Sequence, residues 1–297
     1  MRALVFAAGL GTRLRPLTDT MPKAMVPVCG KPLLHHTISR LVAAGATEIV
    51  VNVHHFAEQI IDYVAQHDWG IPVRISDERN LLLNTGGGLR QALTLFSPSD
   101  APILIHNVDI LSNADLNALY REAQQAQVDA LLVVSERKTQ RYLLFDDSNR
   151  LMGWENIATQ EVRAPYPTLI PSNYRHFAFS GIHIVSPRLA TSLASYPEAF
   201  PIMDFYLNEC QHFHFQAKVV QDLHLLDVGK LDTLSAAENF LQTENRGSSI
   251  PLLGFLSMII LLKYRSHKPN SAKYTYHGTV ITDDSGRKTE KKGSIIW

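Results

Sequence analysis

The sequence of 297 residues carries 28 basic and 28 acidic side chains, so its formal net charge is zero, and 45% of its residues are hydrophobic while 19% are charged. This is the composition of an ordinary globular protein and excludes a disordered chain. A neutral chain lacks the basic field that attracts nucleic acid, so we expect any bound polyanion to be small. The two cysteines, Cys29 and Cys210, are too few for a disulfide framework or a cysteine zinc site, which favours a reducing, cytoplasmic location.

Two apolar runs were considered as membrane or export segments. The first, residues 4–8, leads into a glycine-rich basic segment without a cleavage site and is interpreted as a strand. The second, residues 250–262, contains Pro251 and Gly254 and is shorter than the ~20 residues that a spanning helix needs. We therefore expect no membrane span.

Strand-like runs alternate with helical patterns along the first half of the sequence. The strand-like runs are residues 4–8, 48–53, 72–76, 102–108 and 130–135, and the helical patterns are 33–45, 57–67, 85–96 and 114–126. The strand-like runs are continuously apolar, as parallel strands are when helices cover both faces of a sheet. The sequence therefore predicts an α/β fold with a Rossmann-like, mostly parallel, doubly wound sheet.

The alternation of strand-like runs and helical patterns changes twice in the second half of the chain. Residues 141–156 predict an antiparallel pair turned at Asp147-Ser148-Asn149, a small insertion over the sheet. Beyond Glu244 an apolar run is followed by a polar, lysine-rich end. We expect one domain over residues 1–243 and a C-terminal tail, residues 244–297, to which the sequence assigns no role.

A glycine-rich basic loop follows the first strand. Gly9 and Gly11 allow a phosphate chain to approach the backbone, because no Cβ blocks it, and Arg13, Arg15 and Lys23 add positive charge. Such cations stabilise the charge that grows on a leaving pyrophosphate. The alternative is a tight turn beside surface cations.

The loop differs from two common phosphate-binding motifs. It is not the dinucleotide fingerprint, because the third glycine is missing. It is not a P-loop either, because Pro32 follows Gly30-Lys31 where serine or threonine is required.

A second glycine group, Gly86 to Gly88, follows Asn84-Thr85 and precedes a helical pattern. Each glycine lowers helix propensity by about 1 kcal/mol relative to alanine, so we expect a reason such as close approach to a ligand. The alternative is a flexible loop that enters the helix.

Two aspartates follow apolar runs. Asp109 comes after residues 102–108, and Asp227 ends the run that begins at Leu225. Ligands of open α/β sheets bind at the carboxyl ends of strands, and two carboxylates there could hold one Mg²⁺ together with nucleotide phosphates. The alternative is that each is a turn or cap residue.

The segment GLGTRLRPLTDTMPKAMVPVCGKPLL, residues 9–34, resembles the N-terminal signature of the sugar-1-phosphate nucleotidyltransferases. The resemblance covers about residues 1–243, and it is strongest to members that use N-acetylmuramate 1-phosphate with UTP or mannose 1-phosphate with GTP. It implies a magnesium-dependent enzyme of cell-envelope nucleotide-sugar synthesis that condenses an NTP with a sugar 1-phosphate and releases pyrophosphate. It is compatible with a homo-oligomer. The alternative is a non-catalytic nucleotide-sugar sensor or regulatory protein.

The resemblance also implies residue roles. The implied catalytic residues are Arg13, Lys23 and Asp109, and the implied magnesium ligands are Asp109 and Asp227. The implied nucleotide contacts are Ala8, Gly9, Gly11, Thr12, Arg13, Thr85, Gly86 and Asn107, and the implied sugar contacts are Glu155, Ser180 and Gly181.

Two departures from the family pattern stand out. Where relatives commonly have Asn-Gly-Asp, this sequence has Val108 in the middle, and valine disfavours a positive φ, so the loop is expected to follow a slightly different path. Where many relatives have Glu-Lys-Pro, this sequence has Glu155-Asn156-Ile157. The lysine for the sugar phosphate is therefore missing.

Overall fold

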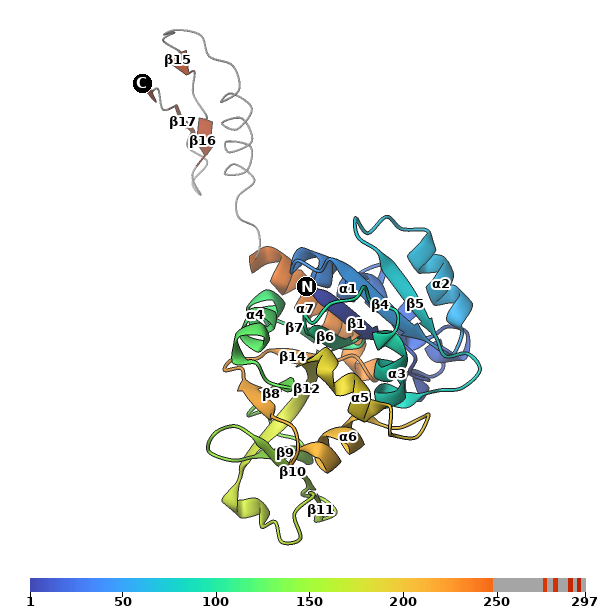
Figure 1. Cartoon of the computed structure of the whole chain (residues 1–297). Coiled ribbons are helices and arrows are strands. Elements are labelled where there is room, and N and C mark those ends of the chain that lie inside the picture. Colours follow the sequence, from blue (N-terminus) through green and yellow to red (C-terminus); the bar gives the residue numbers. More distant parts are fainter. Residues whose placement is uncertain (248–274, 277–279, 283–287, 291–292, 295–297) are drawn as a thin grey trace. The chain divides into compact units, whose positions relative to one another are not determined.

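The computed structural model describes residues 1–247, 275–276, 280–282, 288–290 and 293–294 (Figure 1). The chain divides into two units, Met1–Glu244 and Asn245–Trp297. In the second unit, β15 (Thr275–Tyr276) pairs with β18 (Gly293–Ser294), and β16 (Val280–Thr282) pairs with β17 (Lys288–Glu290). Most of the predicted tail, including residues 250–262, lies outside the described residues.

Ten strands of the first unit form one mixed sheet in the order β11-β10-β9-β12-β6-β1-β4-β5, with β8 beside β12 and β13 beside β8. These strands are β1 (Arg2–Phe6), β4 (Glu48–Val53), β5 (Val73–Asp77), β6 (Ile103–Asn107), β8 (Ala130–Ser135), β9 (Arg141–Phe145), β10 (Leu151–Asn156), β11 (Glu161–Arg163), β12 (Arg175–Val185) and β13 (Phe215–Val219). The pairs among β1, β4, β5 and β6 are parallel. Because β12 runs antiparallel to both β6 and β8, those two strands point the same way, as does β13. The predicted mostly parallel sheet is confirmed.

Helices cover both faces of this sheet (Figure 1). On one face lie α1 (Leu33–Ala43), α2 (Ala57–Ala65), α4 (Leu116–Ala126) and α7 (Leu234–Gly247), and on the other lie α3 (Asn84–Leu93), α5 (Ala190–Leu193) and α6 (Ile202–Glu209). In β1, Ala3 and Val5 belong to the first core, whereas Leu4 and Phe6 belong to the second. A strand with cores on both faces needs apolar residues at every position, which explains the continuous runs in the sequence.

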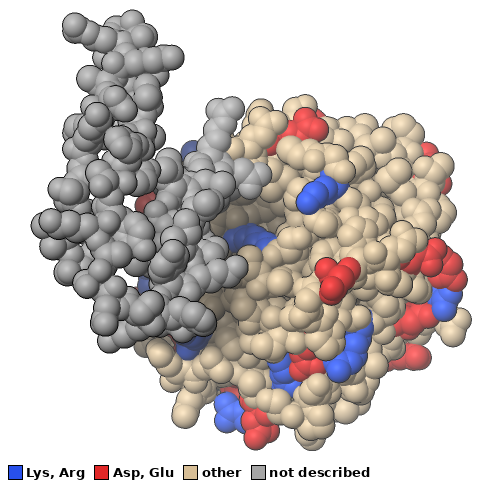
Figure 2. Space-filling view, turned by 90° about the horizontal axis from the view of Figure 1, so that it is seen from above, with Lys and Arg blue, Asp and Glu red and all other residues tan. Residues whose placement is uncertain are grey.

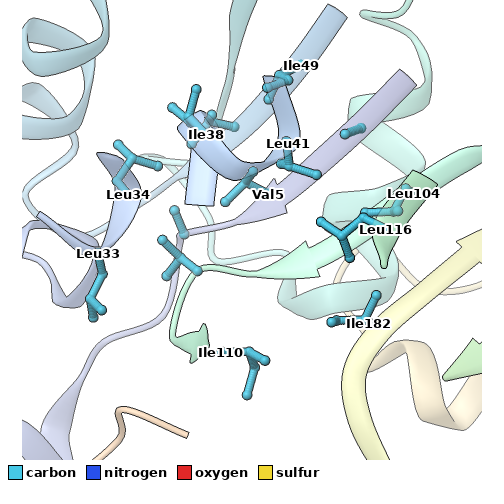
Figure 3. Packing of buried hydrophobic residues seen from close by; sticks show 14 of the residues in the cluster. Val5, Leu33, Leu34, Ile38, Leu41, Ile49, Leu104, Ile110, Leu116 and Ile182 are labelled. Atoms are coloured by element: carbon cyan, nitrogen blue, oxygen red, sulfur yellow. The ribbon is translucent and has the colours of Figure 1, made fainter. Parts of the chain in front are cut away.

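The first core lies between α1 and the parallel strands (Figure 3). Leu34, Ile38 and Leu41 come from one face of α1, at the spacing of an amphipathic helix, and they share this core with Val5 and Ile49. All five side chains are fully buried. Burial of each such side chain contributes about 1.5–3 kcal/mol, so this core fixes α1 against the sheet.

The antiparallel insertion joins the main sheet through β12. β9 and β10 pair antiparallel, and their turn is closed by the Asn149 N–H, which donates to the Asp146 carbonyl oxygen at 2.9 Å, so the predicted pair is confirmed. The first residues of β12 pair with β9, and its last residues pair with β6 and β8. The shorter elements are β2 (Pro27–Val28), β3 (Lys31–Pro32), β7 (Ile110–Ser112), β14 (Leu225–Asp227), and the 3₁₀ turns η1 (Thr12–Leu14), η2 (Leu17–Asp19), η3 (Lys23–Met25), η4 (Pro171–Asn173), η5 (Pro187–Leu189) and η6 (Leu231–Thr233).

The second glycine group lies inside the first turns of α3, which begins at Asn84, and not in a loop before it. A Cβ on Gly86 would come 2.2 Å from the Phe200 ring, and a Cβ on Gly87 would come 2.3 Å from the Glu198 carbonyl oxygen. The sequence suggested close approach to a ligand as the reason for these glycines. The structure gives a different reason, which is close packing of α3 against the segment that precedes α6.

Gly87→Ala is expected to lower the free energy of unfolding by about 2 kcal/mol, because overpacking against a rigid backbone carbonyl costs up to about 3 kcal/mol while alanine regains about 1 kcal/mol of helix propensity. Chemical denaturation measures this loss. Gly9→Ala is the matched control, since a Cβ on Gly9 would meet no atom within 4 Å. A Gly87→Ala protein as stable as the control would contradict the packing explanation.

Candidate active site

The carboxyl ends of β1, β6, β8 and β13 lie on one edge of the sheet, as their pairing directions require. Ligands of open α/β sheets bind at this edge. The loops that leave it bring four charged side chains of the sequence prediction into one group, named here the charged cluster. The charged cluster consists of Arg13, Lys23, Asp109 and Asp227.

The two predicted metal carboxylates are brought together by the pairing of β7 with β14. Asp109 lies in the turn between β6 and β7, and Asp227 ends β14 opposite Ile110. The Val228 N–H donates to the Asp109 carbonyl oxygen at 2.8 Å. Backbone hydrogen bonds thus hold Asp109 and Asp227 close together, although they are far apart in the sequence.

Lys23 lies between these carboxylates. Its Nζ donates to Asp109 Oδ2 and lies 3.9 Å from Asp227 Oδ1. The Lys23 side chain is 10% exposed and the Asp109 side chain 20%, whereas Asp227 is half exposed. The ammonium therefore offsets repulsion between the two carboxylates in a partly shielded position.

Arg13 completes the charged cluster from the solvent side. Its Nη2 lies 3.9 Å from Asp227 Oδ2, and its side chain is 60% exposed. An exposed ion pair of this length adds little stability, so the guanidinium is free to meet a ligand. Arg15 is oriented differently, because its Nε pairs with Asp19 Oδ1 at 3.2 Å.

Gly229 is a neighbour of the cluster that sequence reasoning missed. A Cβ there would lie 2.6 Å from Asp227 Oδ1 and 2.9 Å from Arg13 Nη2. The sequence signal was a glycine two residues after Asp227, and a Cβ there would displace the ends of these two side chains.

The glycines of the first loop have different physical reasons. Gly11 has φ +65°, and a Cβ on it would lie 3.0 Å from both Lys23 Cβ and Thr18 Cγ2, so the fold of the loop requires glycine there. Gly9 does not have a positive φ, and a Cβ on it would meet no atom within 4 Å. No other glycine described in residues 1–243 combines these two properties. The backbone at Gly9 therefore borders open space that a ligand could enter. Thr12 begins η1 beside Arg13 and is exposed.

A buried hydrogen-bond network that sequence reasoning also missed anchors this loop. Asn52 Oδ1 accepts from the Ala7 N–H at 2.7 Å and the Ala8 N–H at 3.2 Å, and Asn52 Nδ2 donates to Glu78 Oε1 at 2.8 Å. Glu78 Oε2 accepts from the Leu83 N–H at 3.1 Å, and burial raises the pKa of Glu78. The sequence signal for this network was a single asparagine, Asn52, within the largely apolar run 48–53. The Ala8 amide is therefore used within the protein.

A cavity of about 180 Å³ lies between the first loop and the start of α3. It is lined by Phe6, Ala8, Gly9, Asn52, Leu82, Asn84, Thr85 and Pro201. The structure thus brings together three predicted nucleotide contacts, Ala8, Gly9 and Thr85. Thr85 also has a structural task, because its Oγ1 accepts from the Ile202 N–H at 2.9 Å, and Gly86 faces Phe200 instead of the cavity.

Gly181 and Asn107 meet beside the charged cluster. Gly181 has φ +77°, and a Cβ on it would lie 2.9 Å from Asn107 Nδ2, so glycine is required for β12 to pass this side chain. Val108 is buried without a positive φ, and its N–H donates to the Phe6 carbonyl oxygen at 3.1 Å. The turn to Asp109 therefore accommodates valine in ordinary backbone geometry.

The other two predicted sugar contacts lie in different environments. Ser180 is buried, and its Oγ accepts from the Ile182 N–H at 3.1 Å, so this hydroxyl is used within its own strand. Glu155 lies on β10, and its Oε2 is 2.8 Å from His176 Nε2. The edge of Tyr142 packs against His176, which fixes this pair within the insertion.

The donor set fits a hard cation shared with a ligand. Among the described residues there is no cluster of three or more His, Cys, Asp or Glu side chains suited to a metal ion. Mg²⁺, however, is commonly held by one or two carboxylates together with substrate phosphates, and Asp109 and Asp227 supply that number.

Two properties of the described surface bear on partners. Acidic and basic side chains are interspersed among the coloured residues of the face in Figure 2, without a large area of one sign. None of the helices described here combines the length and the apolar character needed to cross a membrane.

Comparison with known proteins finds similarity to nucleotidyltransferases. Residues 2–143 match the family described as nucleotidyl transferase. An N-acetylmuramate alpha-1-phosphate uridylyltransferase of Caulobacter vibrioides is 44% identical over 132 residues, which are 43% of this chain and 50% of the relative. A mannose-1-phosphate guanyltransferase of Hypocrea jecorina is 38% identical over 113 residues, 37% of this chain and 31% of the relative. The chain thus spans half or less of the length of these two curated relatives.

The fold agrees with a solved structure of low sequence identity. The crystal structure of HddC from Yersinia pseudotuberculosis has a TM-score of 0.63 at 22% identity and covers 80% of this chain and 98% of that one. Together with the match over residues 2–143, the observed sheet confirms the resemblance noted in the sequence. The chain is thus similar to the nucleotidyl transferase family over residues 2–143, which are just under half of its length.

Proposed function

We propose that the protein is a sugar-1-phosphate nucleotidyltransferase, which transfers a nucleotidyl group from an NTP to a sugar 1-phosphate and releases pyrophosphate. The observation that carries this proposal is the charged cluster at the carboxyl edge of the sheet, next to a cavity that can take a base. The uridylyltransferase and guanyltransferase relatives favour UTP or GTP, with N-acetylmuramate 1-phosphate or a mannose 1-phosphate-like acceptor. A cytoplasmic role in cell-envelope nucleotide-sugar synthesis follows from these substrates.

The reaction needs positioning and charge stabilisation more than proton transfer. A phosphate monoester is already largely ionised near neutral pH, so its oxygen can attack the α-phosphorus of the NTP in line without a general base. The bond to pyrophosphate breaks as the new P–O bond forms. Arg13, exposed beside Asp227, is placed to bind the oxygens of the leaving pyrophosphate.

The acidic side chains would serve a divalent cation. Asp109 and Asp227 would hold Mg²⁺, which neutralises phosphate charge when bound. Lys23 donates to one carboxylate and lies near the other, so it orients both.

The base is proposed to enter the 180 Å³ cavity. Phe6, Leu82 and Pro201 give it apolar walls, while Asn84 and Thr85 can hydrogen-bond a base edge. The Asn52–Glu78 network ties the two sides of this cavity together and keeps its shape.

A pyrophosphate-release assay with UTP or GTP and a panel of sugar 1-phosphates tests the proposed function. The wild-type protein is expected to release pyrophosphate with Mg²⁺, and Asp109→Asn is expected to be inactive although folded, because it keeps an acceptor for Lys23 but loses the charge that a hard cation seeks. Nucleotide binding without pyrophosphate release across the whole panel would instead indicate a sensor.

Arg13→Ala is expected to lower kcat by roughly 10² to 10³, the usual effect of removing one charged donor from a transition state. Arg13→Lys should restore activity in part, because an ammonium cannot form the bidentate contact of a guanidinium. Arg15→Ala is the control, since Arg15 pairs with Asp19. Equal and small effects of Arg13→Ala and Arg15→Ala on kcat would refute the role of Arg13.

Gly9→Ala is expected to keep the wild-type melting temperature and to raise the KM for the NTP by roughly 10- to 100-fold, because a new methyl group would collide with the ligand and not with the protein. Thermal unfolding and steady-state kinetics measure the two quantities. An unchanged KM in a folded variant would show that the nucleotide does not approach Gly9.

A further inference from the structure

The proposed acceptor side has no lysine directly after Glu155, because Asn156 follows it. A sugar 1-phosphate is an anion, so a cation on this side of the site, in addition to the charged cluster, would favour its binding. Arg163 is engaged by Asp204 Oδ1 at 2.7 Å, and Arg175 by Asn149 Oδ1 at 2.7 Å. These two arginines of the insertion are therefore held within it.

Arg137 is differently placed. It is exposed in the loop that leaves β8 at the carboxyl edge of the sheet, and its Nη2 donates to the Phe179 carbonyl oxygen at 3.0 Å. Phe179 lies two residues before Gly181, the residue that packs against Asn107. The guanidinium is thus anchored on the strand that reaches the charged cluster.

A cavity of about 430 Å³ lies beside this arginine, between the β8–β9 loop and the chain that joins β13 to β14. It is lined by Ser135, Glu136, Arg137, Val219, Val220, Gln221, Asp222 and Leu223. Ser135 is 5% exposed, and its Oγ has no hydrogen-bond partner among the described residues. That hydroxyl lies behind the wall of a polar cavity, whose other lining side chains include Glu136, Gln221 and Asp222.

We propose that Arg137 binds an oxyanion of the acceptor substrate, with the neighbouring cavity taking polar groups of the sugar. This inference rests on the proposed function and adds a residue to its acceptor site. A guanidinium has five N–H donors, and the bond to Phe179 uses one of them, which leaves a pair for two oxygens of one anion. The anion is either the 1-phosphate or a carboxylate carried by the sugar, as in muramate, since the same fork binds both.

Steady-state kinetics of Arg137→Gln separate the acceptor from the nucleotide. The KM for the acceptor is expected to rise on the order of 10- to 100-fold, the loss of a charge-assisted hydrogen-bond pair, while the KM for the NTP and kcat change little. Arg137→Lys should restore acceptor binding in part. Arg188→Gln is the matched control, because Arg188 is an exposed arginine at the opposite end of β12 that pairs with Asp129 at 3.4 Å.

Two acceptors identify the anion. If Arg137→Gln weakens mannose 1-phosphate and N-acetylmuramate 1-phosphate alike, Arg137 binds the phosphate, and if it weakens N-acetylmuramate 1-phosphate alone, Arg137 binds the carboxylate. Either result supports the proposal. An unchanged acceptor KM in a variant with the wild-type melting temperature overturns it, as do equal increases in both KM values, which would indicate a structural role of the bond to Phe179.

Failure of the proposed function gives a different result. In that case the wild-type protein releases no pyrophosphate with any substrate pair. Calorimetric titration of the wild-type protein and Arg137→Gln with the two sugar 1-phosphates then decides the role of Arg137 without turnover. Binding that is lost in Arg137→Gln supports the role, and equal binding overturns it.

Discussion

The short antiparallel pairing of β7 with β14 determines the charge arrangement on which the rest of the site depends. It places Asp227 beside Asp109, and the bond from the Val228 N–H to the Asp109 carbonyl fixes their separation. The two carboxylates would repel each other without a cation between them. The partly buried Lys23 ammonium is that cation, because it lies close to both. Arg13 lies on the solvent side, and its charge is only weakly engaged by Asp227.

The glycines of the two glycine groups differ in their surroundings. Gly87 is needed because α3 packs directly on the segment before α6, and this packing forms one wall of the base cavity. Gly9 has no such reason in the fold, because a Cβ there would meet no atom within 4 Å. The Asn52–Glu78 network connects these two regions through buried hydrogen bonds, which resist distortion because an unpaired buried polar group is costly.

The nucleotide side and the acceptor side rest on different observations. The family match ends at residue 143, so it includes the first glycine loop and Asp109 but not β10, β12 or Asp227. The proposed acceptor side therefore rests on geometry alone: β12 passes Asn107 at Gly181, and Arg137 is bonded to the same strand. One fold can take different ligands when the residues of its site differ, so the two sides of the proposed site need separate tests.

The sequence by itself determined the βαβ order, the doubly wound sheet, the antiparallel pair of β9 and β10, and the loop that carries Arg13 and Lys23. These features depend on apolar runs, turn residues and glycines that are close together in the chain, so local patterns report them. Tertiary structure alone decided that Arg13 joins the cluster while Arg15 turns to Asp19, that Gly87 packs against Glu198, and that Asn52 bonds Glu78. Each of these depends on which distant segments meet and which way a side chain points, and local periodicity contains neither.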